Sequence, residues 1–227
     1  MTAITYYGHS TFLVEINNKK ILFDPFISPN ELAEKIDLAS IIADFILVSH
    51  GHGDHVADVE AIANKNDATV VANFEVASWF EAKGVKNTHP MNHGGSKTFD
   101  FGKVKFVNAI HSSTLPDGSS GGHPGGFVVQ SNESTFYFAG DTALTYDMKL
   151  IAEEFKIDFA FLPIGDNFTM GIEDAIKAAG FVGTKKVIGM HYDTFPYIKI
   201  DKEAAIKAAD KQGVELIIFK IGEKITL

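Results

Sequence analysis

The chain has 227 residues, a formal net charge of −9 and no cysteine, and 45% of its residues are apolar. This length and composition suit one α/β domain spanning residues 1–227, and no apolar run reaches the roughly 20 residues that a membrane-spanning helix needs. The acidic charge disfavours an extended nucleic-acid surface. Without cysteine, any bound metal has to be held by nitrogen and oxygen ligands.

The N-terminal segment MTAITYYGHS lacks the basic and apolar regions of a secretory signal peptide. We therefore expect a cytoplasmic protein that acts on a small-molecule substrate. No amphipathic membrane-binding helix stands out, so we expect neither stable membrane association nor a nucleic-acid partner. The chain could still form a homo-oligomer.

Taken in chain order, the pattern begins with strand-like runs and then alternates between strands and helices. The expected strands are ITYYG, TFLVEI, KKILFD, ADFILVS, ATVVA, SKTFDFG, KVKFVNAI, FVVQS, STFYFAG, DFAFLPI, KKVIGM and VELIIF. The expected helices span residues 31–36, 55–64, 74–83, 146–155, 171–183 and 201–213. This order has a rough two-fold character. It favours a mixed sheet sandwich flanked by helices over a simple parallel sheet.

The segment from Ser112 to Gly126 interrupts this alternation with SSTLPDGSSGGHPGG. Its glycine and serine content predicts a mobile surface loop, placed over a site. His123 within it is expected to be solvated. The single tryptophan, Trp79, is expected in the core.

The stretch LVSHGHGDH, residues 47–55, gathers three histidines and one aspartate directly after an apolar run. His50 and His52 are two residues apart, so in extended chain both imidazoles point to the same side and could share one metal ion. Asp54 and His55 follow the turn and could face a second ion. The glycine spacers would allow unusual backbone angles and close packing. A solvated histidine-rich loop is the alternative, which the tight alternation and the embedded aspartate disfavour.

Three further polar residues, His111, Asp141 and His191, also follow strand-like runs. Loops beyond strand ends carry the sites of α/β folds, so these residues could converge with the histidine cluster at one rim. Asp141 could bridge two metal ions. Each has an alternative, since a lone histidine at a strand end is often only a hydrogen-bonded neighbour, and Asp141 in AGDT could form a turn or cap a helix. Their shared placement favours the functional interpretation.

The order of these motifs resembles the metallo-β-lactamase superfamily. The residues that carry the resemblance are GHSTFLVE, ILFDPF, SHGHGDH, AGDTAL, LPIGDNFTMG and MHYDTFP. Within the superfamily, the chain is similar to a branch of small UPF0173-like metal-dependent hydrolases, and to the ascorbate-6-phosphate lactonase and N-acylphosphatidylethanolamine phospholipase D groups. The resemblance implies a four-layer αββα sandwich of two mixed β-sheets flanked by helices, with the site at one edge.

The resemblance also implies two divalent metal ions, with Zn²⁺ favoured and Mn²⁺, Fe²⁺ or Ni²⁺ able to fit. One ion would be held by His50, His52 and His111 and the other by Asp54, His55 and His191, with Asp141 bridging them. The expected reaction is hydrolysis of an ester, lactone or phosphoester bond by a metal-bridged hydroxide. Asp54 and His191 are the expected catalytic residues, and Asp54 would orient the nucleophile or accept its proton.

Four more residues match positions near the site in that branch, namely His9, Asp24, Asp166 and Thr169. Asp24 in ILFDPF is expected either to orient ligands or to form a turn before the following proline. His9 in GHS is expected either to touch substrate or to pack. Asp166 and Thr169 are expected to line the pocket, to cap the next helix, or both.

Two alternative functions stay open at this point. One is a phosphodiesterase or phospholipase D-like hydrolase, which shares the site and differs in substrate. The other is a non-catalytic metal-binding domain, because a fold can host a site without turnover. Ribonuclease-type activity is disfavoured by the acidic charge and by the lack of a second domain. His52 stands where oxygen-reducing diiron relatives carry Glu, which disfavours a redox role.

Overall fold

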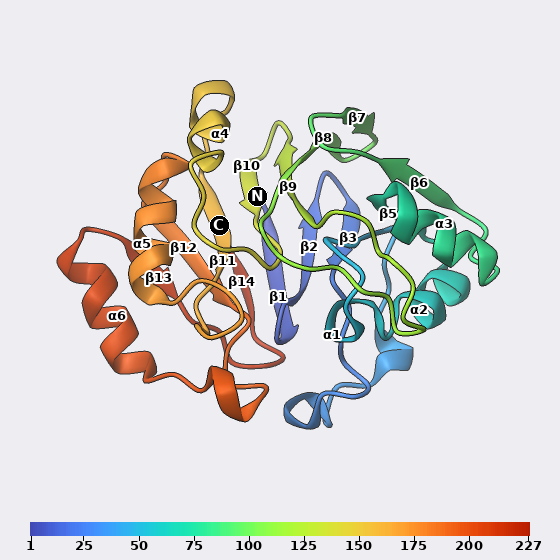
Figure 1. The fold of residues 1–227 in the computed structure, drawn as a ribbon, viewed down its shortest axis with the longest axis horizontal. Helices are drawn as coiled ribbons and strands as arrows, with labels where there is room; N and C mark the ends of the chain where they lie inside the picture. Colours follow the sequence, from blue (N-terminus) through green and yellow to red (C-terminus); the bar gives the residue numbers. More distant parts are fainter.

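The structure, a computed structural model, describes every residue from Met1 to Leu227, and it contains two β-sheets with seven strands each (Figure 1). The first sheet consists of β1 (Ala3–Gly8), β2 (Thr11–Ile16), β3 (Lys19–Phe23), β4 (Phe45–Leu47), β5 (Thr69–Asn73), β6 (Thr88–Met91) and β14 (Lys224–Thr226). The second consists of β7 (Ser96–Phe99), β8 (Gly102–Asn108), β9 (Gly125–Gln130), β10 (Thr135–Phe138), β11 (Phe159–Pro163), β12 (Lys186–Met190) and β13 (Glu215–Ile217).

Six α-helices and three 3-10 turns join these strands. The helices are α1 (Gly53–Val56), α2 (Val59–Asn66), α3 (Phe74–Ala82), α4 (Met148–Glu154), α5 (Ile172–Phe181) and α6 (Lys202–Lys211). The 3-10 turns are η1 (Glu31–Ala33), η2 (Leu38–Ser40) and η3 (Pro196–Ile198). No helix is both long and apolar enough to cross a bilayer.

Each sheet has an antiparallel half and a parallel half. The first sheet has the strand order β14-β1-β2-β3-β4-β5-β6, in which β14 to β3 are antiparallel and β3 to β6 parallel. The second has the order β13-β12-β11-β10-β9-β8-β7, in which β7 to β10 are antiparallel and β10 to β13 parallel. Both sheets thus have the same arrangement of an antiparallel and a parallel half, which is the two-fold character expected from the sequence.

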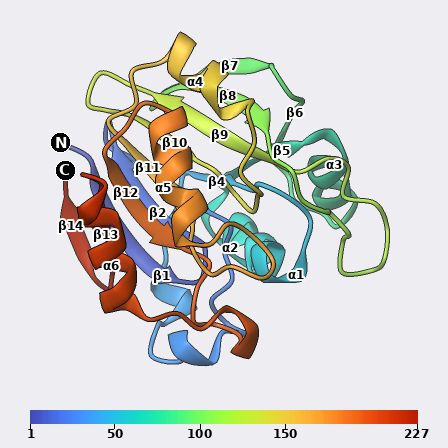
Figure 2. The ribbon, with the colours of Figure 1, turned by 60° about the vertical axis from the view of Figure 1, so that its left-hand side comes forward.

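Alternating side chains explain why the sheets stack with helices outside them. In β2, Phe12 and Val14 enter the larger hydrophobic core, to which both sheets contribute, whereas Leu13 enters a smaller core beneath α2 and α3. In β3, Phe23 enters the larger core and Leu22 the smaller one, because successive side chains of a strand point to opposite faces. Helices α2 and α3 contact the first sheet, and α5 and α6 the second, with α4 packed against α5 (Figure 2). The result is the four-layer αββα sandwich expected from the sequence.

The helix expected over residues 55–64 is divided, because α1 ends at Val56 and α2 begins at Val59. The buried Asp58 carboxylate accepts hydrogen bonds from the backbone N–H groups of Ile27 and Ser28, at 2.6 and 2.9 Å. This long-range contact fixes Asp58 outside a continuous helix. The helix expected over residues 31–36 is only the 3-10 turn η1.

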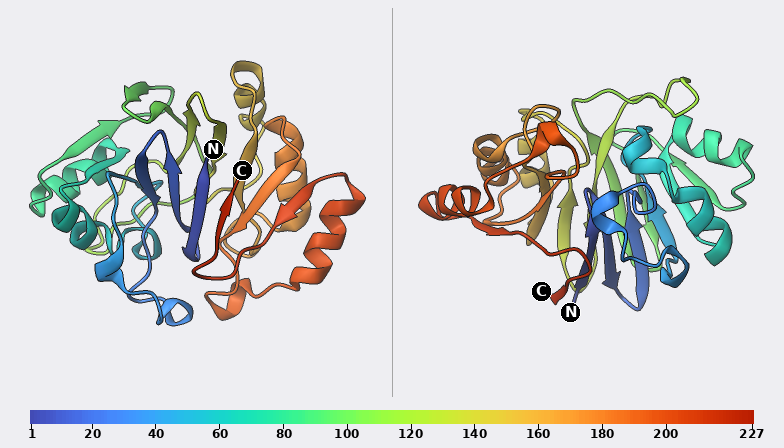
Figure 3. Two further views of the ribbon diagram at one scale, coloured as in Figure 1. Left: turned by 180° about the vertical axis from the view of Figure 1, so that it is seen from behind. Right: turned by 90° about the horizontal axis from the view of Figure 1, so that it is seen from below.

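Strands β6 and β14 were not expected from the sequence. β6 contains Pro90, which a strand tolerates at the edge of a sheet because one side of an edge strand needs no ladder hydrogen bond. β14 is the opposite edge and has only three residues. It pairs with β1 and so brings the two ends of the chain together, where the Thr2 N–H donates to the Leu227 carbonyl at 3.2 Å (Figure 3).

Candidate metal centre

Loops from both sheets bring the seven expected ligand residues into one cluster. His50 and His52 follow β4, Asp54 and His55 lie in α1, and the other three follow β8, β10 and β12. Asp141 is at the centre of the cluster. Its Oδ2 lies near four imidazole Nε2 atoms, at 2.9 Å from His191, 3.2 Å from His55, 3.5 Å from His111 and 3.9 Å from His50.

The cluster divides into the two groups that the resemblance implies. His50, His52 and His111 place ligand atoms within 4.8 Å of one another, and so do Asp54, His55 and His191, which His9 joins. Two ligand atoms on a tetrahedral zinc ion lie about 3.3 Å apart, given zinc–nitrogen bonds of about 2.0–2.1 Å. These spacings therefore suit a metal ion in each group. That these residues bind metal stays a prediction.

The hydrogen bonds of His55 show that the cluster requires positive charge. Its Nδ1 lies 2.8 Å from Asp24 Oδ2, and because a carboxylate only accepts, Nδ1 carries the hydrogen. In a neutral ring, Nε2 then carries no hydrogen, and its lone pair faces Asp141 Oδ2, which is 3.2 Å away. Two acceptors at this distance repel one another unless a cation or a proton joins them. The buried atoms His55 Nε2, Asp141 Oδ1 and His191 Nδ1 have no hydrogen-bond partner, so the donor set fits divalent cations.

The ionisation of the cluster follows from burial and charge together. Burial lowers the pKa of His55, but the carboxylates of Asp141, Asp54 and Asp24 together raise it by more, so the pKa lies well above its usual value. Burial raises the pKa of Asp141, yet His191 and His55 hold that pKa well below its usual range. Burial keeps the pKa of His50 well below its usual value. The ring of His50 is therefore neutral, as a metal ligand must be.

Asp24 supports this cluster from beneath and is fully buried. Its Oδ1 accepts the Ser49 N–H at 2.7 Å, and its Oδ2 accepts the Ser49 hydroxyl at 2.6 Å as well as His55 Nδ1. Ser49 Oγ has given its hydrogen to Asp24, so it accepts from His50 Nδ1, which lies 2.9 Å away. The bonds of Asp24 thus direct Nε2 of both His50 and His55 into the cluster. Sequence reasoning missed Ser49, although it begins the SHGHGDH motif.

His9 neither reaches solvent nor merely packs. It is 1% exposed, its Nε2 lies 3.1 Å from Asp54 Oδ2, and its Nδ1 lies 3.0 Å from Thr194 Oγ1. Burial, and then the neighbouring His191, lower the pKa of His9 to about 4, so the ring is neutral at neutral pH. Nε2–H then donates to Asp54, while Nδ1 faces the Thr194 hydroxyl, which also has the Tyr192 carbonyl within reach at 3.3 Å. Sequence reasoning also missed Thr194, which lies in the MHYDTFP motif.

The backbone around His9 is held in an unusual conformation. His9 has a φ of 55° and His191 a φ of 56°, both in the left-handed region that non-glycine residues rarely adopt. The His191 N–H donates to the His9 carbonyl at 2.9 Å, and the Tyr6 hydroxyl donates to the same oxygen at 3.2 Å. These bonds fix the turn between β1 and β2 against the end of β12, and with it both rings.

The structure does not bring Asp166 and Thr169 to the cluster. Asp166 is exposed, and the Thr169 hydroxyl bonds only the neighbouring carbonyl of Met170, at 3.4 Å. The expectation that they cap the next helix is wrong, because α5 has Gly171 as its N-cap and no side-chain capping bond. Their loop contacts the site only through its backbone, where the Met170 N–H donates to the Thr142 carbonyl at 3.1 Å.

The two glycine spacers of the histidine motif differ in their roles. Neither has a positive φ, so the expected unusual backbone angles are absent. A Cβ atom on Gly51 would lie 3.0 Å from Leu115 Cδ2, so Gly51 permits close approach of the loop formed by residues 112–126. A Cβ atom on Gly53 would meet nothing within 4 Å. Close packing therefore explains only Gly51.

The loop of residues 112–126 borders the cluster and is anchored by hydrogen bonds. Ser112 Oγ lies 3.1 Å from His52 Nε2, and Ser113 Oγ accepts the Gly51 N–H at 3.0 Å. The Trp79 indole donates to Asp117 Oδ2 at 2.6 Å. Trp79 is only partly buried, because it covers the loop rather than filling the core as expected. His123 is exposed, as expected.

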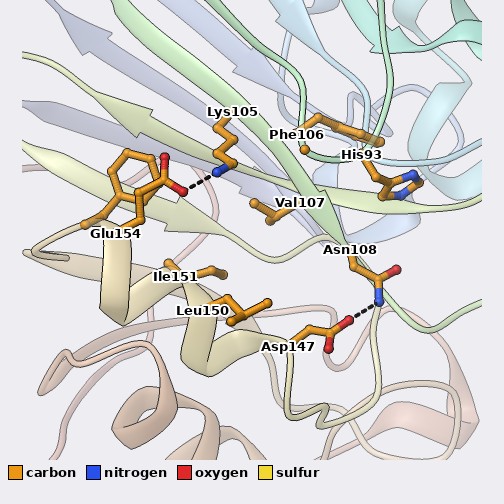
Figure 4. Close-up of a pocket in the computed structure, with 11 residues that line it drawn as sticks. His93, Lys105, Phe106, Val107, Asn108, Asp147, Leu150, Ile151 and Glu154 are labelled. Carbon is orange, nitrogen blue, oxygen red and sulfur yellow. Dashed lines mark hydrogen bonds and ion pairs between the residues drawn. The ribbon is translucent and has the colours of Figure 1, made fainter.

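A pocket of about 340 Å³ between β8 and α4 lies apart from this cluster (Figure 4). Its apolar floor includes Val107 and Leu150. Its polar groups already bind one another, since Lys105 pairs with Glu154 and the Asn108 amide donates to Asp147 at 2.7 Å. With its polar groups satisfied, this pocket offers no free catalytic group.

Comparison with known proteins identifies the family of the chain. The sequence matches the beta-lactamase superfamily domain over residues 19–192. A UPF0173 metal-dependent hydrolase from Flavobacterium johnsoniae is 54% identical over 224 residues, which cover 99% of either chain. Another from Christiangramia forsetii is 54% identical over 225 residues, again covering 99% of either chain.

Solved structures share the whole fold. Igni18, a metallo hydrolase from the hyperthermophilic archaeon Ignicoccus hospitalis, has a TM-score of 0.89 at 30% identity and covers 100% of this chain and 98% of its own. YhfI from Bacillus subtilis, at 15% identity, has a TM-score of 0.76 over 99% of this chain and 98% of its own. These matches confirm the predicted metallo-β-lactamase fold. The chain belongs to the UPF0173 metal-dependent hydrolase family of the metallo-β-lactamase superfamily.

Proposed function

We propose that this protein is a metal-dependent hydrolase of a small molecule and that its histidine cluster holds two divalent ions. Relatives of this chain are metal-dependent hydrolases, which supports hydrolysis. The observation that carries the proposal is the Asp141 carboxylate, whose Oδ2 lies within 3.9 Å of the Nε2 atoms of four imidazole rings. One ion would be held by His50, His52 and His111 and the other by Asp54, His55 and His191, with Asp141 between them. Nitrogen-rich ligation favours Zn²⁺.

Bound divalent ions would polarise a substrate oxygen and lower the pKa of water toward neutrality. Asp54 is the carboxylate that water and substrate can reach, because its side chain is 24% exposed whereas that of Asp141 is 2% exposed. His9 holds Asp54 by the hydrogen bond at Oδ2. Asp54 therefore accepts the proton of the attacking water. His191, whose Nε2 lies 2.9 Å from Asp141 Oδ2, would contribute as a ligand of the second ion beside that carboxylate.

The substrate would approach across the partly exposed members of the cluster, His52, Asp54 and His111. Ser112, which is exposed and contacts His52, lies beside this path. An ester, lactone or phosphoester fits the proposed chemistry, because each places an electrophilic centre next to an oxygen that a cation can polarise.

The first test is the metal content of purified protein by elemental analysis. We expect about two ions per chain in the wild type and about one in His52→Ala, which removes a proposed ligand. His123→Ala is the matched control, because this exposed histidine lies on the same loop as Ser112 but outside the cluster. No bound metal after reconstitution with Zn²⁺ or Mn²⁺, or full occupancy in His52→Ala, would overturn the proposal.

The second test is a panel of chromogenic carboxyl esters, lactones and phosphodiesters on metal-loaded protein. We expect Asp54→Asn to lower kcat/KM about 100-fold or more for whichever bond is cleaved, as loss of a general base does. Turnover of phosphodiesters alone would identify the phosphodiesterase alternative. Tight metal binding with no turnover on the whole panel would identify a non-catalytic metal-binding domain.

A further inference from the structure

A second pocket, of about 610 Å³, is lined by residues from both ends of the chain, among them Tyr6, Tyr192 and Phe219. His9 and Thr194, the residue that bonds its Nδ1, both line this pocket. Its volume lies within the range of roughly 300–1,000 Å³ that is typical of small-molecule sites. At its edge are Leu32 of η1 and Lys199 directly after η3.

The walls of this pocket are apolar and already bonded among themselves. Tyr6, Tyr192 and Phe219 are each at most 4% exposed. The two tyrosine hydroxyls donate to backbone carbonyls, that of Tyr6 to His9 at 3.2 Å and that of Tyr192 to Phe219 at 3.3 Å. The Thr194 hydroxyl is bonded to the His9 ring. The free donors that remain for a ligand are therefore the lysine ammonium groups.

Three lysines from separate segments line the pocket, namely Lys199, Lys202 and Lys220. The only carboxylate among the lining residues is that of Asp193, and Lys202 Nζ pairs with it at 2.8 Å. Lys199 and Lys220 have no carboxylate within 4.0 Å. Their combined field favours an anion at this place.

We propose that this pocket binds an anionic small molecule. Its phosphate or carboxylate group would lie between Lys199 and Lys220, and its apolar part against Phe219 and Ile221. The pocket is already shaped for such a ligand, because the Asp193 N–H donates to the Ile198 carbonyl at 2.8 Å and Asp193 Oδ1 accepts the Ile200 N–H at 3.1 Å. The site is distinct from the metal centre, and it does not depend on the proposed hydrolysis.

The test is calorimetric titration of metal-loaded protein with inorganic phosphate at low ionic strength. We expect the double variant Lys199→Ala/Lys220→Ala to raise the phosphate Kd about tenfold or more, because charge-assisted hydrogen bonds are the strong ones. The matched control is Lys207→Ala/Lys211→Ala, which removes the same charge from the exposed face of α6. Its Kd should stay within about twofold of the wild type, since distant exposed charges are screened. Equal binding by all three proteins, or an equal loss in the control, would overturn the proposal.

A third variant distinguishes this pocket from phosphate bound at the metal centre. His52→Ala alters the proposed metal ligation and leaves the lysine pocket intact, so it should retain the lysine-dependent phosphate binding. If phosphate binding is lost in His52→Ala and kept in the double lysine variant, the pocket proposal is wrong and the hydrolase proposal stands. A parallel titration with acetate separates a carboxylate site from a phosphate site, because acetate should compete with phosphate only if the pocket accepts both anions.

Discussion

Replacing Asp24 by Asn removes one charge beneath the metal centre while keeping the side-chain volume. Asp24 is fully buried and accepts three hydrogen bonds, two from Ser49 and one from His55 Nδ1. An amide can accept at only one of its two heavy atoms, so its NH₂ group would face either a serine hydroxyl or the His55 N–H. A buried hydrogen bond to a charged group contributes about 1.5–3 kcal/mol. We expect a loss of about 2–4 kcal/mol in the free energy of unfolding, which is one to two such bonds.

The same substitution should weaken metal binding, because Asp24 fixes the ring of His55 and, through Ser49, that of His50. Partners of metal ligands typically account for about 10–100-fold in metal affinity. Chelator competition measures this affinity, and urea unfolding measures the stability. Asp44→Asn is the control, since Asp44 also accepts a backbone N–H, that of Lys20 at 2.8 Å, but lies away from the cluster. If Asp24→Asn and Asp44→Asn have the same metal affinity, Asp24 does not support the site.

Three further predictions test the packing, the orientation of the site and the buried tyrosine. Gly51→Ala should destabilise the protein by about 1 kcal/mol in urea unfolding because its Cβ would lie 3.0 Å from Leu115 Cδ2 and that side chain would have to shift, whereas Gly53→Ala should be neutral. Thr194→Val should lower metal affinity about tenfold by freeing the His9 ring, and Thr194→Ser should restore it; equal affinity in both variants would contradict this role. Burial raises the pKa of Tyr137 above its ordinary value of about 10 and its hydroxyl has no partner, so stability is full below pH about 10 and falls as the pH rises above it. Tyr137→Phe should gain about 1 kcal/mol at neutral pH and lose less stability above pH about 10, and an unchanged alkaline profile would refute the assignment.

Sequence spacing predicted the residues of the cluster because strand ends and short motifs are local features. His50 to His55 lie within six consecutive positions, and His111, Asp141 and His191 each follow an apolar run. Their shared placement at strand ends predicted that they could converge, and the resemblance to the metallo-β-lactamase superfamily supplied the division into two groups.

Long-range contacts explain the parts that could not be predicted from the sequence. Asp58 divides a helix because Ile27 and Ser28 reach it across the fold, and no local pattern around residue 58 indicates this. Ser49 and Thr194 are small polar residues whose roles exist only through their partners, Asp24 and His9. The same holds for the lysine pocket, which needs segments on either side of α6 to meet.

The placement of the ligand residues also couples the two sheets. Within the group of His50, His52 and His111, two side chains follow a strand of the first sheet and one follows the second. In the other group, Asp54 and His55 follow the first sheet and His191 follows the second. Asp141 also follows the second sheet, and its carboxylate lies beside both groups. Each bound ion would therefore join the two sheets directly, and binding to the folded state alone stabilises it by about 2.7 kcal/mol per site at 100 times the dissociation constant. The buried acceptors of the cluster repel one another unless cations or protons join them, so bound ions would stabilise the fold at the residues that hold them.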